Sequence, residues 1–186
     1  MHTPEYERAI KLLFIGPVGA GKTAAIRAIS DAPPVSTDVP WTEPATDGKS
    51  TTTAVFDYST VRLDQGDVLH VYGLPGQERL NFMGPIVGRG ALGGILLLDA
   101  SSPVLQEDCV QSIKGLKRIS PNLKFVIGVT KTDISPGFCM NTMRRLMQQM
   151  SLSAPIFSID SRDRAQVIQL VRTLLLVLQD GPSSVT

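Results

Sequence analysis

The chain has no marked excess of charge of either sign, and it contains very few cysteines. Its 186 residues carry 18 Lys and Arg against 17 Asp and Glu, a formal net charge of +1. That balance provides no extended positive field, so we do not expect nucleic-acid binding by bulk electrostatics. The cysteines are only Cys109 and Cys139, with no metal-ligand spacing. We expect both to be reduced, buried or half-buried thiols of a cytosolic protein.

Long apolar runs are also missing. The best candidate, residues 167–178, carries Arg172 and is shorter than the ~18 apolar residues that a membrane-spanning helix needs. Residues 1–5 lack the basic and apolar regions of a signal peptide. His2 excludes myristoylation at that position, and residues 183–186 offer no cysteine for prenylation. We therefore expect a cytoplasmic protein with no direct membrane anchor, recruited to membranes only through partners.

Apolar runs alternate with helical patterns along the whole chain. Strands are predicted at 9–15, 54–63, 68–74, 94–99, 124–129 and 156–159, and helices at 23–30, 104–119, 140–150 and 164–178. Such alternation is typical of βαβ units in a parallel sheet covered on both faces. A turn signal at 64–67 predicts one hairpin. We expect one α/β domain over residues 1–186, with a mostly parallel six-stranded sheet and one antiparallel edge strand.

Between the first helix and the hairpin, the sequence has little periodicity. Residues 31–50 contain Pro33, Pro34, Pro40 and Pro44. We interpret this stretch as a long loop, and loops beyond ~12–15 residues in compact domains are usually functional or disordered.

Residues 16–23 read Gly-Pro-Val-Gly-Ala-Gly-Lys-Thr and fit the pattern GxxxxGK[ST] between a predicted strand and a predicted helix. Glycines allow the backbone N–H groups to point at phosphate oxygens, and the helix N-terminus adds about half a positive charge. Lys22 would supply a full charge to the β- and γ-phosphates, and the Thr23 hydroxyl would ligate Mg²⁺. The alternative is an ordinary glycine-rich turn with an exposed lysine. The candidate binding residues of this phosphate-binding loop are Gly16, Gly19, Ala20, Gly21, Lys22, Thr23 and Ala24.

Residues 130–133, Thr-Lys-Thr-Asp, follow the predicted strand 124–129. Ligands of parallel sheets bind beyond the carboxyl ends of the strands. A carboxylate at Asp133 can accept two hydrogen bonds from guanine N1 and N2, which adenine cannot donate, so it would select guanine. Taken alone, a Lys-x-Asp after a strand can also be a solvated turn.

With the loop at 16–23, the threonines at 51–53, residues 74–79 (Leu-Pro-Gly-Gln-Glu-Arg), residues 130–133 and residues 158–162, the sequence resembles the small Ras-like GTPases over nearly the whole chain. Residues 72–79 and 160–162 make it similar to a bacterial branch, related to the gliding-motility (Mgl-type) GTPases and to predicted GTPases of actinobacterial conserved operons. The resemblance implies a three-layer P-loop NTPase fold of the Ras-like type, with GTP or GDP and Mg²⁺ as ligands.

The resemblance also implies roles in hydrolysis. Thr53 would ligate Mg²⁺ together with Thr23 and meet the γ-phosphate; we choose it over Thr51 and Thr52 because it lies four residues before the pair Asp57-Tyr58. Gly76 would donate its N–H to the γ-phosphate, and Gln77 would orient the attacking water. The catalytic residues would then be Gln77, Lys22 and Thr53. Residues 31–53 would form switch I, residues 73–90 switch II, and residues 181–186 a disordered tail.

The base would be recognised at the other end of the site. By the same resemblance, Lys131 would pack along the base, Asp133 would recognise guanine, and the Ser161 backbone would contact the guanine carbonyl. Thr130 and Arg162 complete the expected set of binding residues.

Two positions depart from the family pattern. Gly73 stands where most members have an aspartate that holds Mg²⁺ through water, and Thr130 replaces the usual asparagine. Loss of such an outer-sphere carboxylate often costs ~10–100-fold in metal affinity or activity. Asp99 ends the next strand, but the sequence alone does not make it a replacement. A threonine can still hydrogen-bond to the phosphate-binding loop, with fewer groups than an amide.

These observations predict a nucleotide-dependent molecular switch with slow Mg²⁺-dependent GTP hydrolysis. We read Arg62, Arg79 and Arg89 as surface salt-bridge partners, so a partner protein would supply an arginine or a loop rearrangement worth ~10³–10⁵ in rate. The family implies regulatory partners of the roadblock type. A nucleotide-binding scaffold with negligible hydrolysis is the main alternative, and an ATP-binding P-loop protein is a weaker one.

Overall fold

The computed structural model describes residues 10–42, 51–63, 67–74 and 88–179, with the side chains of 36–42 and 51–56 left out of the description. The strands are β1 (Ile10–Ile15), β2 (Val35–Thr42), β3 (Thr51–Arg62), β4 (Val68–Gly73), β5 (Ala91–Asp99), β6 (Phe125–Thr130) and β7 (Ile156–Ser158). The helices are α1 (Lys22–Ile29), α3 (Leu105–Ile119), α4 (Met140–Gln149) and α5 (Arg164–Gln179), with a 3₁₀ turn at Thr132–Ile134. The predicted helices and all but one of these strands were anticipated to within about three residues at each end.

The strands form one sheet in the order β2-β3-β4-β1-β5-β6-β7. All pairs from β4 to β7 are parallel, and β3 is antiparallel to both of its neighbours. The prediction of an α/β protein with a mostly parallel sheet and a β3–β4 hairpin is confirmed. The predicted strand number is wrong, because the described residues alone form seven strands of the sheet, and the antiparallel strand β3 is not at the edge.

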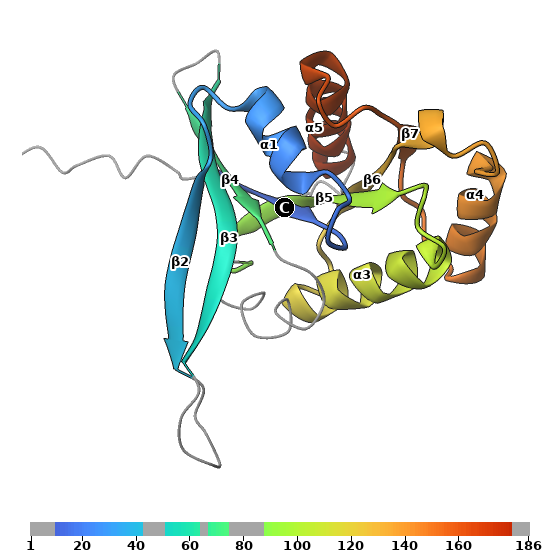
Figure 1. Ribbon diagram of the computed structural model, residues 1–186, viewed down its shortest axis with the longest axis horizontal. Helices are drawn as coiled ribbons and strands as arrows, with labels where there is room; N and C mark the ends of the chain where they lie inside the picture. The colour runs from blue at the N-terminus through green and yellow to red at the C-terminus, as the bar shows by residue number, and fades with distance from the viewer. Residues whose placement is uncertain (1–9, 43–50, 64–66, 75–87, 180–186) are drawn as a thin grey trace, which may run out of the picture.

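The additional strand is β2, in a stretch predicted to be part of the loop 31–53. It pairs with β3 from Val35–Tyr58 to Thr42–Thr51 and forms the edge of the sheet beside β3 (Figure 1). A proline such as Pro40 is tolerated in an edge strand because one side of that strand makes no ladder hydrogen bonds. The prolines therefore indicated a loop where the chain forms an edge strand.

Alternation along the central strands divides the core into two layers. Leu13, Leu96 and Leu98 pack with α3 and α4, whereas Leu12, Phe14 and Leu97 pack with α1 and α5 on the other face. Figure 1 shows α1 and α5 on one side of the sheet and α3 on the other. Strand β5 is buried on both faces because both of its side-chain rows meet a helix layer, as its unbroken apolar sequence predicts.

Several smaller predictions can also be compared with the structure. Met143 and Met147 face the core from α4. Both cysteines are free; Cys109 is buried, but Cys139 is exposed, because it precedes the first turn of α4 rather than facing the sheet. Among the described residues, no helix has the length and apolarity to cross a membrane. The predicted tail at 181–186 lies outside the described residues.

The parallel strands β1, β5, β6 and β7 all end at the same edge of the sheet. Residues 16–21 follow β1, residues 131–134 follow β6, and residues 159–163 follow β7. The topology thereby brings together three loops that are far apart in the sequence, at the edge where parallel sheets bind ligands.

Candidate functional site

The loop predicted from the sequence to bind phosphate occupies residues 16–21 between β1 and α1. Gly16, Gly19 and Gly21 have φ angles of 144°, 83° and 90°. Residues with a Cβ rarely adopt positive φ angles, so glycine is required for this path of the backbone. A Cβ added at Gly16 would lie 2.0 Å from the carbonyl oxygen of Leu97, and one at Gly21 would lie 2.6 Å from Ser161 Oγ. The loop is therefore wrapped tightly against β5 and against the loop after β7.

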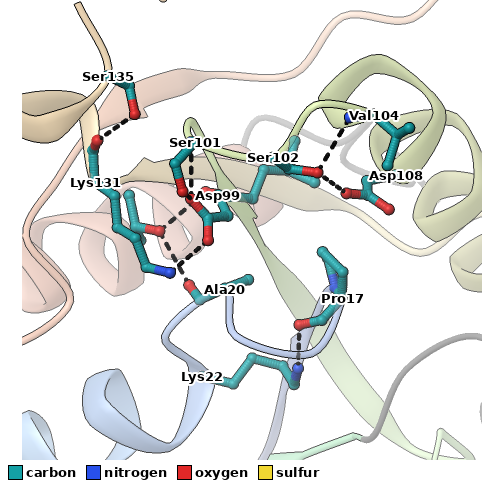
Figure 2. Close-up of polar contacts among 12 residues, drawn as sticks. Pro17, Ala20, Lys22, Asp99, Ser101, Ser102, Val104, Asp108, Lys131 and Ser135 are labelled. Atoms are coloured by element: carbon teal, nitrogen blue, oxygen red, sulfur yellow. Dashed lines mark hydrogen bonds and ion pairs between the residues drawn. The ribbon is translucent and has the colours of Figure 1, made fainter.

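Lys22 lies at the first position of α1, and its side chain folds back over the loop. Its ammonium donates to the carbonyl oxygen of Gly16 at 2.8 Å. It also donates to the carbonyl oxygen of Pro17 at 2.7 Å, as Figure 2 shows. Burial lowers the pKa of Lys22 to about 8, against the opposing effect of the Asp57 carboxylate. The loop thus holds a partly desolvated cation at its centre, and an anion there would recover the charge stabilisation that burial removes.

Thr23, the next residue of α1, contacts a carboxylate from β3. Its hydroxyl donates to Asp57 Oδ2 at 2.5 Å. In the β3–β4 ladder, Asp57 is directly opposite Gly73. A Cβ at Gly73 would lie 3.4 Å from Asp57 Oδ2 and 2.7 Å from Ile26 Cδ1. The Asp57 side chain therefore lies over Gly73, in the space that an aspartate at position 73 would begin to enter.

Sequence reasoning noted that position 73 lacks a carboxylate, but it did not find that the Asp57 carboxylate lies beside that position. In the sequence analysis, Asp57 was used only to choose Thr53 as the second expected Mg²⁺ ligand beside Thr23. The signal that could have found it was the hairpin itself, because directly opposite residues of an antiparallel pair point to the same face.

Thr130 ties the end of β6 to the phosphate-binding loop. Its hydroxyl lies 3.2 Å from the carbonyl oxygen of Ala20 and 3.1 Å from that of Leu98, and the side chain is buried. The expectation that threonine can replace asparagine in contacting this loop agrees with these distances. Ser161 is also buried against Gly21, so residues from β6 and from the loop after β7 both reach the loop that precedes α1.

The two loops expected to contact the base lie side by side. The hydroxyls of Thr132 and Ser158 are 2.6 Å apart. Asp133, in the 3₁₀ turn, is exposed. Hydrogen bonds to Asp160 raise the pKa of Arg162, and the nearby Asp133 carboxylate adds to that rise. The Arg162 side chain forms a forked pair with Asp160, and its exposed fraction is 78%.

Lys131 makes a contact that the sequence did not predict. Its ammonium forms an ion pair with the carboxylate of Asp99 at the end of β5 (Figure 2). Asp99 is also bound by Ser101, through the backbone N–H at 2.8 Å and the hydroxyl at 2.5 Å.

Of Thr53, Gly76 and Gln77, which are expected to act on the γ-phosphate, the structure describes only the backbone of Thr53. Thr53 lies in β3, opposite Pro40 of β2, and its side chain is outside the description. Gly76, Gln77 and Arg79 lie outside the described residues, as does most of the segment 73–90 predicted as switch II. Most of the described part of the segment predicted as switch I is strand rather than loop, since residues 35–42 and 51–53 are strand, while residues 31–34 are irregular.

Arg62 can be excluded as a built-in source of positive charge at the Asp57–Thr23 contact. It lies five residues beyond Asp57 at the other end of β3, roughly 17 Å away at the rise of a strand. Arg89 is exposed before β5, where its carbonyl accepts a hydrogen bond from Lys11.

No protein-family model matches the chain. Over 125 residues it is 29% identical to a protein of Methanocaldococcus jannaschii described as uncharacterized protein MJ1339, covering 67% of this chain and 71% of that protein. The description of this relative states no activity.

Proposed function

We propose that the chain is a Ras-like P-loop GTPase, which binds guanine nucleotides with Mg²⁺ and hydrolyses GTP slowly as a molecular switch. The observation that carries the proposal is the junction of Thr130 with Ala20. This contact holds the loop at residues 16–21, which would bind phosphates, beside the loop at residues 131–134, which would bind guanine. The sheet order and the two helix layers are compatible with this fold.

The phosphates would replace the contacts that Lys22 makes within its own loop. Hydrogen bonds to charged groups are each worth ~1.5–3 kcal/mol when formed in a partly desolvated site. Lys22 can exchange the carbonyl oxygens of Gly16 and Pro17 for phosphate oxygens without leaving the loop. Backbone N–H groups at the start of α1 would add to the stabilisation.

The oxygen atoms of Thr23 in α1 and Asp57 in β3 suit Mg²⁺ as ligands. This ion is usually bound through one or two carboxylates, hydroxyls and substrate phosphates. Thr23 and Asp57 supply a hydroxyl and a carboxylate in direct contact. The described residues contain no group of three or more His, Cys, Asp or Glu that would make a metal site by themselves, so these two would hold the ion together with the nucleotide. When bound, Mg²⁺ would neutralise charge on the phosphates.

Turnover would be slow in the isolated protein. Gln77 is expected to orient the attacking water. Arg62 lies at the end of β3, away from the Asp57–Thr23 contact, and the Arg162 guanidinium is paired with Asp160. A partner that supplies an arginine would accelerate the reaction by ~10³–10⁵. Single-turnover hydrolysis, measured alone and with roadblock-type partners, separates this switch from a scaffold that binds nucleotide without hydrolysing it.

The first experiment is identification of the nucleotide in purified protein. Denaturation should release GDP or GTP in an amount comparable to the protein, and calorimetry of the emptied protein should show GDP binding with Mg²⁺ far tighter than ADP binding. An empty protein that gives no heat with either guanine nucleotide would contradict the proposal. Preference for ADP would support an ATP-binding protein instead.

Asp133→Asn should change the preferred base. An asparagine amide cannot accept both N1 and N2 hydrogen bonds of guanine, so GDP affinity should fall by about 10- to 100-fold. The same amide complements xanthine better, and XDP affinity should rise. Calorimetric titration with GDP and XDP measures both. The control is Arg145→Ala, a substitution at an exposed position of α4. Equal GDP affinity in Asp133→Asn and wild type would show that Asp133 does not bind the base.

Asp57→Asn should selectively weaken the Mg²⁺-dependent part of binding. The asparagine keeps the size of the side chain and can still accept the Thr23 hydrogen bond, but it loses the negative charge. We expect the gain in GDP affinity produced by Mg²⁺ to fall about 10- to 100-fold, with affinity in EDTA nearly unchanged.

The matched control is Asp31→Asn, which removes the negative charge of a carboxylate that accepts a hydrogen bond from the Arg62 backbone N–H. It should leave the Mg²⁺ effect intact. If Asp57→Asn retained the full Mg²⁺ effect in the same calorimetric titration, another residue would have to supply the carboxylate.

A further inference from the structure

The ion pair between Asp99 and Lys131 spans the carboxyl ends of two neighbouring strands. Asp99 is the last residue of β5, and its register partner in β6 is Thr130, the residue before Lys131. Figure 2 shows the Lys131 side chain extended toward Asp99 on the side of the phosphate-binding loop marked by Ala20. The side chain of Lys131 is 39% exposed and that of Asp99 is 13% exposed. The anion of this pair is therefore mostly enclosed, while the lysine borders solvent.

Asp99 is held rigidly for this contact. One carboxylate oxygen, Oδ1, accepts both hydrogen bonds from Ser101, which leaves Oδ2 for the Lys131 ammonium. Burial disfavours the charged carboxylate, but the hydrogen bonds from Lys131 and Ser101 outweigh it and hold the pKa of Asp99 below its usual range. The carboxylate is charged at neutral pH and fixed in direction from two sides.

Lys131 is also constrained at its backbone. Its φ angle of 58° is left-handed, which is uncommon for a residue with a long side chain. The Lys131 carbonyl accepts a hydrogen bond from the Ser135 hydroxyl at 2.8 Å. With the backbone and the ammonium both fixed, the methylene groups between them have little freedom, although the side chain is partly exposed.

We propose that Asp99 is a positioning residue that fixes Lys131 beside the phosphate-binding loop before nucleotide arrives, so that the methylene stem of Lys131 forms a preformed wall for the guanine ring. This inference rests on the proposed function. Immobilising a flexible side chain on binding costs about 0.5–1.5 kcal/mol, a factor of about 2 to 12 in affinity. In this protein the ion pair with Asp99 already immobilises Lys131 in the nucleotide-free state, so that nucleotide binding would not have to.

The test is Asp99→Asn, which keeps an acceptor for Ser101 but removes the charge that attracts Lys131. GDP affinity, measured by calorimetry, should fall about three- to tenfold. The response to inorganic pyrophosphate, measured as the rise in unfolding temperature on titration, should not change because pyrophosphate has no base. Asp108→Asn, in the first turn of α3 and bonded to Ser102, is the matched control and should leave both unchanged.

Lys131→Met provides the second variant, because it keeps a long apolar side chain and removes only the charge. It should lower GDP affinity by a similar factor, and the double variant should lose no more than either single one, since the two residues act as one unit. Losses that add in the double variant would overturn the inference. So would unchanged GDP affinity in Asp99→Asn, or equal losses toward GDP and pyrophosphate, which would indicate a general effect on the loop. Failure of the wild type to bind GDP would instead refute the proposed function itself.

Discussion

Gly16→Ala is expected to distort the predicted phosphate-binding loop and to destabilise the fold by about 2–5 kcal/mol, more than the same change at Gly19. The added Cβ would lie 2.0 Å from Leu97 O and 3.1 Å from Leu97 C. Those atoms belong to the backbone of a buried central strand, which cannot move away as the end of a side chain can. Forced overpacking costs ~1–3 kcal/mol or more, and a positive φ angle adds ~1–2 kcal/mol for alanine.

Gly19→Ala is the matched control for this prediction. Gly19 also has a positive φ angle, 83°, but a Cβ there would meet nothing within 4 Å. Only the conformational strain remains, so the loss should be about 1–2 kcal/mol. Denaturant unfolding of the two nucleotide-free variants at one pH gives the comparison. If both lost the same stability, the close packing of Gly16 against β5 would be wrong.

Lys22→Met should make the nucleotide-free protein more stable while reducing GDP affinity at least ~100-fold. The pKa of Lys22 falls from 10.5 to about 8 on folding, so at neutral pH the fold carries the cost of a buried charge, of the order of 1–3 kcal/mol. Methionine fills similar space without that cost. The lost affinity corresponds to two charge-assisted hydrogen bonds to phosphate.

The pH dependence provides a separate check on Lys22. Between pH 8 and 10.5 the unfolded chain holds the Lys22 proton and the folded one does not, so the stability of the free wild type should rise with pH across this range. Below pH 8 the full cost is present and constant. Lys22→Met should lack this rise when the two proteins are unfolded by denaturant at pH 7 and pH 10. A variant that is less stable at pH 7, or that binds GDP within tenfold of wild type, would contradict the assigned role of the ammonium.

Much of the fold followed from the sequence because its signals are local. The apolar run at 94–99 predicts a strand buried on both faces, and β5 is such a strand. Strand β2 was missed because four prolines between 31 and 50 outweighed its β-branched residues. Whether a proline-containing stretch forms an edge strand depends on the partner it finds, here β3, and that partner is not a local property.

The site was predictable wherever a motif fixed it. Residues 16–23, Thr130 and Ser161 meet as expected, because parallel strands bring their carboxyl ends to one edge. Asp57 was missed because its position opposite Gly73 depends on the length of the connection between the strands. The hydrogen bond from Leu63 to Asp67 closes that connection around three residues. A connection one residue shorter or longer would shift the register and turn a different side chain toward Thr23. The Asp99–Lys131 pair was missed for a similar reason. The predicted positions of the strand ends do not determine which side chains of neighbouring strands contact each other.

The Thr130 hydroxyl has a single proton, yet it lies within hydrogen-bond distance of two carbonyl oxygens, those of Ala20 and Leu98. An asparagine amide would bring two protons and could serve both acceptors at once. The threonine hydroxyl can donate its proton to only one of these oxygens at a time, so a rotation that strengthens the hydrogen bond to Ala20 weakens the one to Leu98. The chain thus joins the end of β6 to the loop after β1 and to β5 by two alternative hydrogen bonds, where an asparagine amide could donate both at once.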